Sequence, residues 1–253
     1  MIDHLSPSQI RTYLTCPKRW EFRYVHGIKT PPAGAMICGS AYHYGLAEYF
    51  NGKAESIDDV ADAFSQSWDY QLDVCNTQDE EDVIPFDKSD IEWDDEPGKV
   101  KDDGITLIKY YRTNIAPNIE PETVENRKET DINGCKLVTI TDLVLSDKVI
   151  DHKVKKKRFS DTDKLNDIQV TAYTCVEKKP FNYHVALRQK EKTVEIINDD
   201  TLYRSPNDMR FFKELVADVW NAIEAGIFPC RPEGWHCTDQ WCGYWKLCRG
   251  KKS

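Results

Sequence analysis

The sequence lacks an apolar run long enough to span a membrane, and its first residues, MIDHLSPSQIRTYL, lack the basic stretch followed by an apolar stretch that marks a secretory signal. We therefore expect no membrane association and a cytoplasmic location. The sequence also has no internal repeat, which excludes a solenoid or another repeat architecture. It has no P-loop, so any helicase function would belong to a partner protein.

An excess of positive charge is missing as well. The 253 residues include 43 acidic and 34 basic side chains, so the net charge is −9, which argues against general electrostatic attraction to nucleic acid. Much of the acid lies between Asp79 and Asp103, a stretch with Pro85 and Pro97. We interpret this stretch as a solvated connector.

The length and a hydrophobic content of 40% fit one large soluble domain or two small ones. Apolar spacing predicts helices first and then mostly strands, with Asn133-Gly134 as a turn and a capping box from Ser6 to Gln9. The predicted helices are Ser6 to Leu14, Lys18 to Val25, Ala35 to Phe50, Ser56 to Leu72, Ile105 to Ile115, Asp161 to Glu177 and Asn207 to Ala225. The predicted strands are Thr123 to Asp131, Leu137 to Val154 as two arms, Tyr183 to Arg188 and Lys192 to Ile197, the last two around QKEK.

The stretch LVTITDLVLSDKVIDHKVKKKR, from Leu137 to Arg158, predicts two strands around a turn at Ser146-Asp147. A two-residue loop would place Asp142 directly opposite Asp151, and the period of two puts Lys153 on the same face. Opposed Cβ atoms are roughly 4.5 to 5.5 Å apart, so like charges there destabilise a sheet unless something neutralises them.

Two interpretations of this hairpin remain open. A hard divalent cation would neutralise the two carboxylates, or Lys153 would form a structural ion pair with them on a wet face of the sheet. A basic run follows at once, comprising Lys153, Lys155, Lys156, Lys157 and Arg158. Such a run is usually a solvated strand end, but its position beside the acidic pair favours contact with phosphate.

Nine cysteines are many for a cytoplasmic chain, in which disulfides are rare. Five are scattered and are expected to be small core residues, with Cys230 the least certain of Cys38, Cys75, Cys135, Cys175 and Cys230. The other four are Cys16, Cys237, Cys242 and Cys248. Three of these lie in the aromatic-rich end FPCRPEGWHCTDQWCGYWKLCRGKKS, which cannot bury a core of its own, so thiolate ligation of a metal or cluster would hold it.

Together these features resemble the RecB-like branch of the PD-(D/E)XK nuclease superfamily, particularly the iron–sulfur exonucleases of CRISPR-associated systems, AddB subunits and phages. LSPSQIRTYLTCPKRWEFRYV resembles the family's N-terminal helix with its first cluster cysteine, and GSAYHYGLAE carries His43. IDHK supplies a D-x-K motif, and Gln169 and Tyr173 match Q-x-x-x-Y. Two departures are Thr139-Ile140-Thr141, where the family often has a glycine, and the wide gap between Cys237 and Cys242.

The resemblance implies an α/β (α+β) fold with a restriction-endonuclease-like core sheet flanked by helices. A single nuclease domain is expected to span residues 1–253. Within it, residues 1–120 would be mainly helical with the first cluster cysteine, 121–200 would form the catalytic sheet, and 201–253 would form a helix and a cysteine segment that closes onto the N-terminal region.

The resemblance also implies the roles of the site residues. His43, Asp142 and Asp151 would bind one or two Mg²⁺ or Mn²⁺ ions, with the backbone carbonyl of His152 as a further ligand. Lys153 would position the attacking water or stabilise the transition state. Gln169 and Tyr173 would orient the DNA strand or the lysine; their other interpretation is as ordinary helix residues that face the sheet.

A 4Fe–4S cluster held by Cys16, Cys237, Cys242 and Cys248 would staple the two ends of the chain, with Zn²⁺ as the alternative occupant and Cys230 as a reserve ligand. The expected function is a metal-dependent exonuclease acting on single-stranded DNA in recombination and repair, phage replication or CRISPR adaptation. A helicase, a recombination or adaptation protein, or a second copy of the chain are the partners to consider. The alternative function is a catalytically silent DNA-binding module stabilised by the cluster or zinc.

Overall fold

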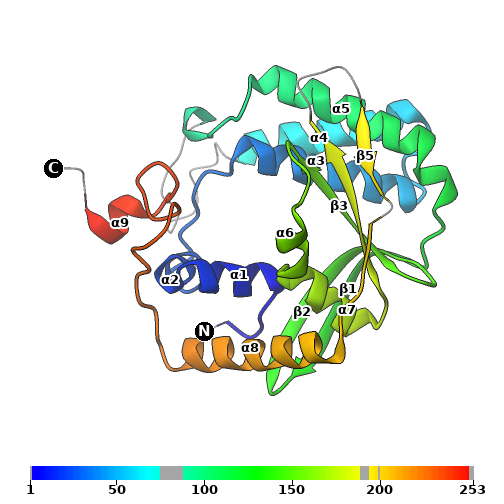
Figure 1. Ribbon diagram of the computed structural model, residues 1–253. Coiled ribbons are helices and arrows are strands. Elements are labelled where there is room, and N and C mark those ends of the chain that lie inside the picture. The colour runs from blue at the N-terminus through cyan, green and yellow to red at the C-terminus, as the bar shows by residue number, and fades with distance from the viewer. Residues whose placement is uncertain (1, 75–87, 189–193, 199, 251–253) are drawn as a thin grey trace.

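The computed structural model describes residues 2–74, 88–188, 194–198 and 200–250, in which helices surround a six-stranded sheet (Figure 1). Its α-helices are α1 Pro7–Thr15, α2 Pro17–Tyr24, α3 Gly34–Phe50, α4 Ile57–Val74, α5 Pro97–Asn114, α6 Asp161–Leu165, α7 Ile168–Glu177, α8 Pro206–Glu224 and α9 Trp245–Arg249. Short 3₁₀ helices are η1 Lys88–Asp90 and η2 Ala116–Asn118. The strands are β1 Thr123–Ile132, β2 Cys135–Val144, β3 Val149–Lys155, β4 Phe181–Leu187, β5 Glu195–Ile197 and β6 Thr201–Leu202.

The sheet has the strand order β1-β2-β3-β4-β5, and β6 also pairs with β4. The first three strands form an antiparallel meander, whereas β4 runs parallel to β3 after a crossover through α6 and α7. Asn133 and Gly134 join β1 to β2 and both have positive φ, of 52° and 84°, as a tight hairpin turn requires. The predicted fold class and this predicted turn are confirmed.

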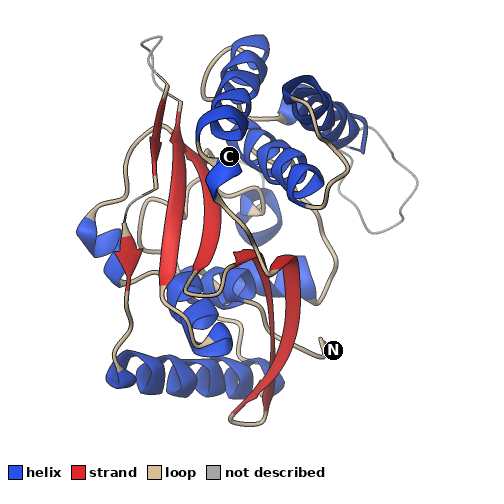
Figure 2. Cartoon of the chain, turned by 90° about the vertical axis from the view of Figure 1, so that its right-hand side faces the viewer, coloured by secondary structure: helices blue, strands red, loops and turns tan. Residues whose placement is uncertain are grey.

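Two hydrophobic cores lie on the two faces of the sheet. One is formed with α1, α2, α7 and α8, and the other with α3, α4 and α5. On β4, Val185 and Leu187 enter the first core while Ala186 enters the second, as the alternation of a strand dictates. Figure 2 shows the helices as two groups at opposite ends of the long strands. The two cores therefore pack helices on both faces of the sheet.

Two predicted helices have different bounds in the structure. Asp161 to Glu177 is two helices, because Asp167 caps α7 by accepting a hydrogen bond from the backbone N–H of Gln169 at 2.8 Å. Helix α5 begins at Pro97 rather than Ile105, since Pro97 occupies the first helical turn and Glu96 caps it. The later part of the predicted connector is therefore helical. Residues 79–87 of the connector lie outside the described residues, as do the predicted QKEK turn and Cys75.

The first helix begins as predicted, with the hydroxyl of Ser6 accepting from the N–H of Gln9 at 3.3 Å. The second bond of the predicted capping box, from the backbone N–H of Ser6 to the Gln9 side chain, is not formed. The Gln9 carboxamide oxygen is buried and has no partner among the described residues. Within that same part of the chain, no helix combines the length and apolar character needed to cross a lipid bilayer.

Candidate active site

The β2–β3 hairpin brings two buried carboxylates together. Its last backbone pair, Leu143 with Ile150, makes Asp142 and Asp151 the next residues along each strand, which is the predicted register. Pairing ends there, and the backbone N–H of His152 donates instead to Asp142 Oδ2 at 2.7 Å. Asp142 and Asp151 are 7% and 1% exposed, so both acids need compensating charge or hydrogen bonds.

A third carboxylate, that of Glu125, comes from β1. The β1–β2 ladder pairs the residues on either side of Glu125 with those on either side of Asp142, so the two acids face each other across the strands. Glu125 has a φ of 48°, which is strained for a non-glycine residue. The sequence analysis missed Glu125, although the Asn133-Gly134 turn that it predicted sets this register.

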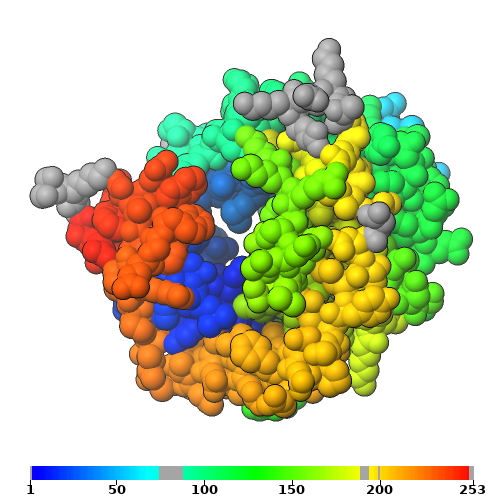
Figure 3. Space-filling model, viewed as in Figure 1, coloured from blue at the N-terminus to red at the C-terminus, as the bar shows by residue number. Residues whose placement is uncertain are grey.

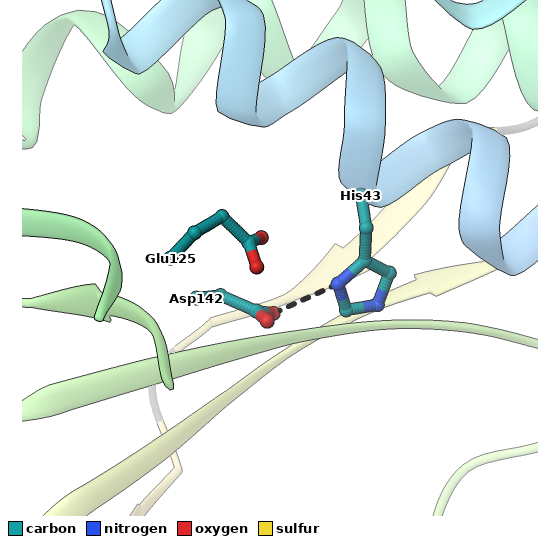
Figure 4. Close-up of side chains that lie close together, drawn as sticks. All are labelled: His43, Glu125 and Asp142. Atoms are coloured by element: carbon teal, nitrogen blue, oxygen red, sulfur yellow. Dashed lines mark ion pairs between the residues drawn. The ribbon is translucent and has the colours of Figure 1, made fainter. Parts of the chain in front are cut away.

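Helix α3 places His43 over the sheet, where its Nδ1 lies 3.1 Å from Asp142 Oδ2. His43, Glu125 and Asp142 each offer one ligand atom, and these three atoms lie within 4.8 Å of one another (Figure 4). Two carboxylates and an imidazole are ligands that suit Mn²⁺ and, through their oxygens, Mg²⁺. The three side chains therefore fit a divalent metal. They come from helix α3 and from the adjacent strands β1 and β2.

The charges of this group determine the pKa values around it. Burial alone would raise the pKa of Asp142, but the charge of His43 and the hydrogen bonds from His152 and His43 hold it well below its usual value. Burial raises the pKa of Asp151 to about 6, Lys153 opposes that rise, and the charge of Asp142 adds to it. Burial and Asp142 also raise the pKa of Glu125. Acids that repel one another in this way favour the binding of a cation.

Asp151 is held by residues that the sequence analysis singled out. Lys153 forms an ion pair with Asp151 Oδ2, and the Gln169 amide donates to Asp151 Oδ1 at 2.9 Å. The same amide nitrogen of Gln169 lies 2.9 Å from the hydroxyl of Tyr173, which donates to the backbone carbonyl of Ile140. Gln169 thus contacts Asp151 directly, and Tyr173 holds the Gln169 amide, so neither residue merely packs on the sheet.

His152 lies beside the group rather than in it. Its imidazole is 2% exposed, and its Nδ1 lies 3.4 Å from Asp142 Oδ2. The role of its backbone carbonyl as a metal ligand, and that of Asp151, remain predictions. Three carboxylates, a histidine and a lysine thus meet at one place, a set that would hold a divalent metal beside a positive charge.

A family model of the PD-(D/E)XK nuclease superfamily matches residues 4–249. The chain belongs to this superfamily. PD-(D/E)XK nucleases typically use Mg²⁺ or Mn²⁺, and the group of His43, Glu125 and Asp142 supplies suitable ligands. Among solved structures, a candidate exonuclease from Eubacterium rectale has a TM-score of 0.60 and 13% identity, covering 94% of this chain and 87% of that one, which shows a shared fold. No curated protein matches the sequence.

In this nuclease, the segment after α8 returns to the N-terminal helices. The hydroxyl of Tyr244 donates to the carbonyl of Ile28 at 2.8 Å, and that of Tyr13 donates to the carbonyl of Ile227 at 2.6 Å. The ring of Phe228 stacks on Trp20 with centroids 5.6 Å apart. Figure 1 accordingly shows the C-terminal segment beside α2. Side-chain contacts therefore hold the C-terminal segment against the N-terminal helices.

This return creates a small cavity lined by Cys16, Cys230, Cys237, Cys242 and Cys248. Cys230 is exposed, with its Sγ 3.3 Å from that of Cys248, so the prediction that it is a core residue is wrong. Cys38 and Cys135 are buried, as predicted. The cavity is also lined by Lys18, Arg19, Arg231 and Arg249, whose positive charge would offset that of several thiolates. The donor set fits a thiolate-bound metal or cluster.

Proposed function

We propose that the chain is a metal-dependent DNA exonuclease that hydrolyses phosphodiester bonds, preferably in single-stranded DNA. The observation that carries this proposal is the meeting of the His43, Glu125 and Asp142 group with the ion pair of Asp151 and Lys153 on one sheet. A protein that only bound DNA would gain nothing from carboxylates that repel both one another and phosphate. A nuclease needs them to hold a cation.

His43, Glu125 and Asp142 would hold the metal, with Asp151 adjacent to complete the site. Bound Mg²⁺ or Mn²⁺ supplies a water of lowered pKa and stabilises negative charge on the phosphate. The protein's part is to keep its ligands in place. Asp142 is fixed by His43 and by the backbone of His152, and Asp151 by Gln169.

Lys153 would contact the phosphate under attack. Its ammonium is desolvated, which lowers its pKa, yet the charges of Asp151 and Asp142 outweigh this effect and raise the pKa above its usual value. Lys153 is therefore charged at neutral pH, and its side chain is 25% exposed, so the ammonium can be reached from the site. A fixed positive charge next to a developing oxyanion stabilises the transition state.

The shape of the molecule supports a single strand as substrate. Figure 3 shows an opening bounded by the N-terminal segment in blue, the segment after β3 in light green, and the C-terminal segment in orange and red. A second hollow, of about 370 Å³, borders Gln169 and Tyr173 and is lined by His4, Arg11 and Arg127. Basic side chains in such hollows neutralise phosphates in a protein of net negative charge.

The basic run at the end of β3 is a weaker candidate for contact with DNA than its sequence suggests. Lys156 binds Asp94 Oδ2 at 3.2 Å, and Arg158 forms an ion pair with Glu195. The ammonium of Lys155 lies over the ring of Phe159, 3.9 Å from its centroid. Two members of the run therefore contact acids of the protein, as Arg127 does with Glu129. We place the strand nearer Arg127 because Arg127 lines the hollow that borders Gln169 and Tyr173.

The cysteine cavity would hold a 4Fe–4S cluster, with zinc as the alternative. Cys16, Cys237, Cys242 and Cys248 would be its ligands, and Cys230 lies close enough to Cys248 to replace it. The cluster would act structurally, since Cys16 stands at the junction of α1 and α2 while the others stand in the C-terminal segment.

Digestion of end-labelled single-stranded DNA with Mn²⁺, against a control with EDTA, tests the function. We expect release of short products only with metal, faster than from a duplex. Lys153→Ala should lower kcat by about 100-fold or more, because one charge at the oxyanion is lost. Lys101→Ala is the matched control, since Lys101 also pairs with an aspartate, Asp69 at 2.9 Å, and is 27% exposed.

Circular dichroism would confirm that both variants fold. Metal-dependent cleavage that survives in Lys153→Ala would refute the role of Lys153. Binding of DNA without any cleavage by the unaltered protein would refute the nuclease proposal and favour a binding module.

A further inference from the structure

A buried chain of polar side chains extends from Asp142 into the interior. His152 Nδ1 lies 3.4 Å from Asp142 Oδ2, and His152 Nε2 lies 2.9 Å from the hydroxyl of Tyr111. That hydroxyl lies 2.6 Å from Nδ1 of His184. His152, Tyr111 and His184 are 2%, 0% and 4% exposed. These residues come from β3, α5 and β4, so their sequence spacing gives no hint of the chain.

The direction of each hydrogen bond follows from what each group can donate. An ionised carboxylate only accepts, so Nδ1 of His152 must carry a proton where it faces Asp142. In a neutral imidazole Nε2 then accepts, which makes Tyr111 the donor to His152. The Tyr111 oxygen must in turn accept from the Nδ1–H of His184. The opposite direction would set a lone pair of His152 against the carboxylate.

The surroundings favour this arrangement. Burial, His152 and Lys148 lower the pKa of His184 well below its usual value, so that ring is neutral and has one N–H to give. The Tyr111 ring also packs edge-on against His152, with centroids 5.1 Å apart. The Tyr111 hydroxyl thus supports the tautomer that Asp142 favours, and the Tyr111 ring helps to fix the orientation of His152.

We propose that Tyr111 and His184 are positioning residues that act through His152 to orient Asp142 for metal binding. The inference rests on the proposed metal site. Groups that hydrogen-bond to metal ligands fix their orientation, and losing one typically weakens metal binding by about 10- to 100-fold. Tyr111 lies outside the group of ligand atoms and does not itself bind metal.

Tyr111→Phe removes the hydroxyl and keeps the ring. We expect its affinity for Mn²⁺, measured from the electron paramagnetic resonance signal of free Mn²⁺ in the absence of DNA, to fall by about tenfold. The control is Tyr42→Phe, because the Tyr42 hydroxyl is equally buried, lies in the same core and has no partner among the described residues. Its affinity should stay within about twofold of the unaltered protein.

Imidazole ¹⁵N spectra give a second readout that a purely structural role would not change. In the unaltered protein we expect His152 with its proton on Nδ1; in Tyr111→Phe this preference should weaken. His184→Asn, which keeps an N–H near Nδ1, should retain more Mn²⁺ affinity than His184→Leu.

Equal Mn²⁺ affinity in folded Tyr111→Phe and Tyr42→Phe, or a His152 proton on Nε2, would overturn the inference while leaving the metal site intact. Absence of Mn²⁺ binding by the unaltered protein would instead refute the site on which the inference rests.

Discussion

Glu125 is the residue whose role depends most on the fold. It lies opposite Asp142, has a left-handed backbone, and completes a set of three ligand atoms with His43. Strained backbone persists when its surroundings impose it, and often occurs at functional sites. We infer that the strain at Glu125 turns its carboxylate toward Asp142 and His43 rather than along the ordinary direction of a strand side chain.

Glu125→Gln tests this role. The affinity for Mn²⁺ should fall by at least about tenfold, because a direct ligand contributes no less than a group that supports one. Thermal stability should be retained or rise, since burial and the charge of Asp142 both disfavour the charged form of Glu125 and raise its pKa. Glu129→Gln is the control, as Glu129 lies on the same strand and pairs with Arg127. Unchanged Mn²⁺ affinity in Glu125→Gln would show that Glu125 is not a metal ligand.

Residues near one another in sequence were the predictable part of the site. Asp142, Asp151 and Lys153 share one hairpin, so a turn and a period of two suffice to align them. Glu125 needed the register of a second hairpin, which was available from Asn133-Gly134 but was not applied. The chain of Tyr111 and His184 joins a helix to a strand 73 residues away, and no local pattern encodes such a contact.

At the level of elements, strands β1 and β2 define how a substrate strand could lie. Arg127 pairs with Ile140 in the β1–β2 ladder, and Glu125 and Asp142 lie two residues away along the same strands. Because side chains alternate with a period of two, Arg127 and Glu125 lie on the same face of β1, and Ile140 and Asp142 on the same face of β2. Arg127, Ile140 and Gln169 all line the hollow of about 370 Å³. The hollow therefore continues the row of residues that holds the acidic group.

Arg127→Gln should weaken binding of single-stranded DNA. Loss of one phosphate contact should reduce the slope of log affinity against log salt concentration by about 0.7. Arg210→Gln is the control: Arg210 also pairs with a glutamate, Glu214 at 3.3 Å, and is 68% exposed against 53% for Arg127. The slopes are measured by fluorescence anisotropy with EDTA present. Equal slopes for both variants would show that the DNA strand does not bind in this hollow.

Helix boundaries were less predictable than helices themselves. The split between α6 and α7 depends on the Asp167 cap, and Asp167 is also bound by Arg11 and by the hydroxyl of Tyr183. These long-range contacts favour a cap where apolar spacing alone favours one continuous helix. The break sets where Gln169 begins α7, and hence how it reaches Asp151.

For the whole molecule, the cysteine cavity joins segments more than 200 residues apart. Cys230 was grouped with core cysteines because its spacing is irregular, yet the return of the C-terminal segment places it next to Cys248. The lack of a core of its own predicted that the C-terminal segment needs thiolate ligation, and the resemblance implied four cysteine ligands with Cys230 in reserve. The fold places all five thiols at one cavity.

Cys237→Ser should remove the absorbance near about 400 nm that an iron–sulfur site gives, and lower Tm by roughly 10 °C, because a link between distant segments is lost. Cys175→Ser, at a half-buried cysteine outside the cavity, is the control. Cys230→Ser should keep both the colour and the Tm if Cys230 is only a reserve ligand. A colourless protein that contains one zinc per chain would establish the alternative occupant.

The closure of the cavity also has a consequence for the order of events during synthesis. The sheet and its acids are complete by residue 202, whereas Cys237, Cys242 and Cys248 emerge from the ribosome only afterwards. Cys16 must therefore wait, as a reduced thiol, while more than 200 further residues are added. Domains fold as they are made at about 5–20 residues per second, so Cys16 is without its partner thiols for at least about ten seconds. Loading of the proposed cluster or zinc would then be the last step of maturation. A chain that stalls in α8 would have its nuclease sheet but would lack the cysteines of the C-terminal segment.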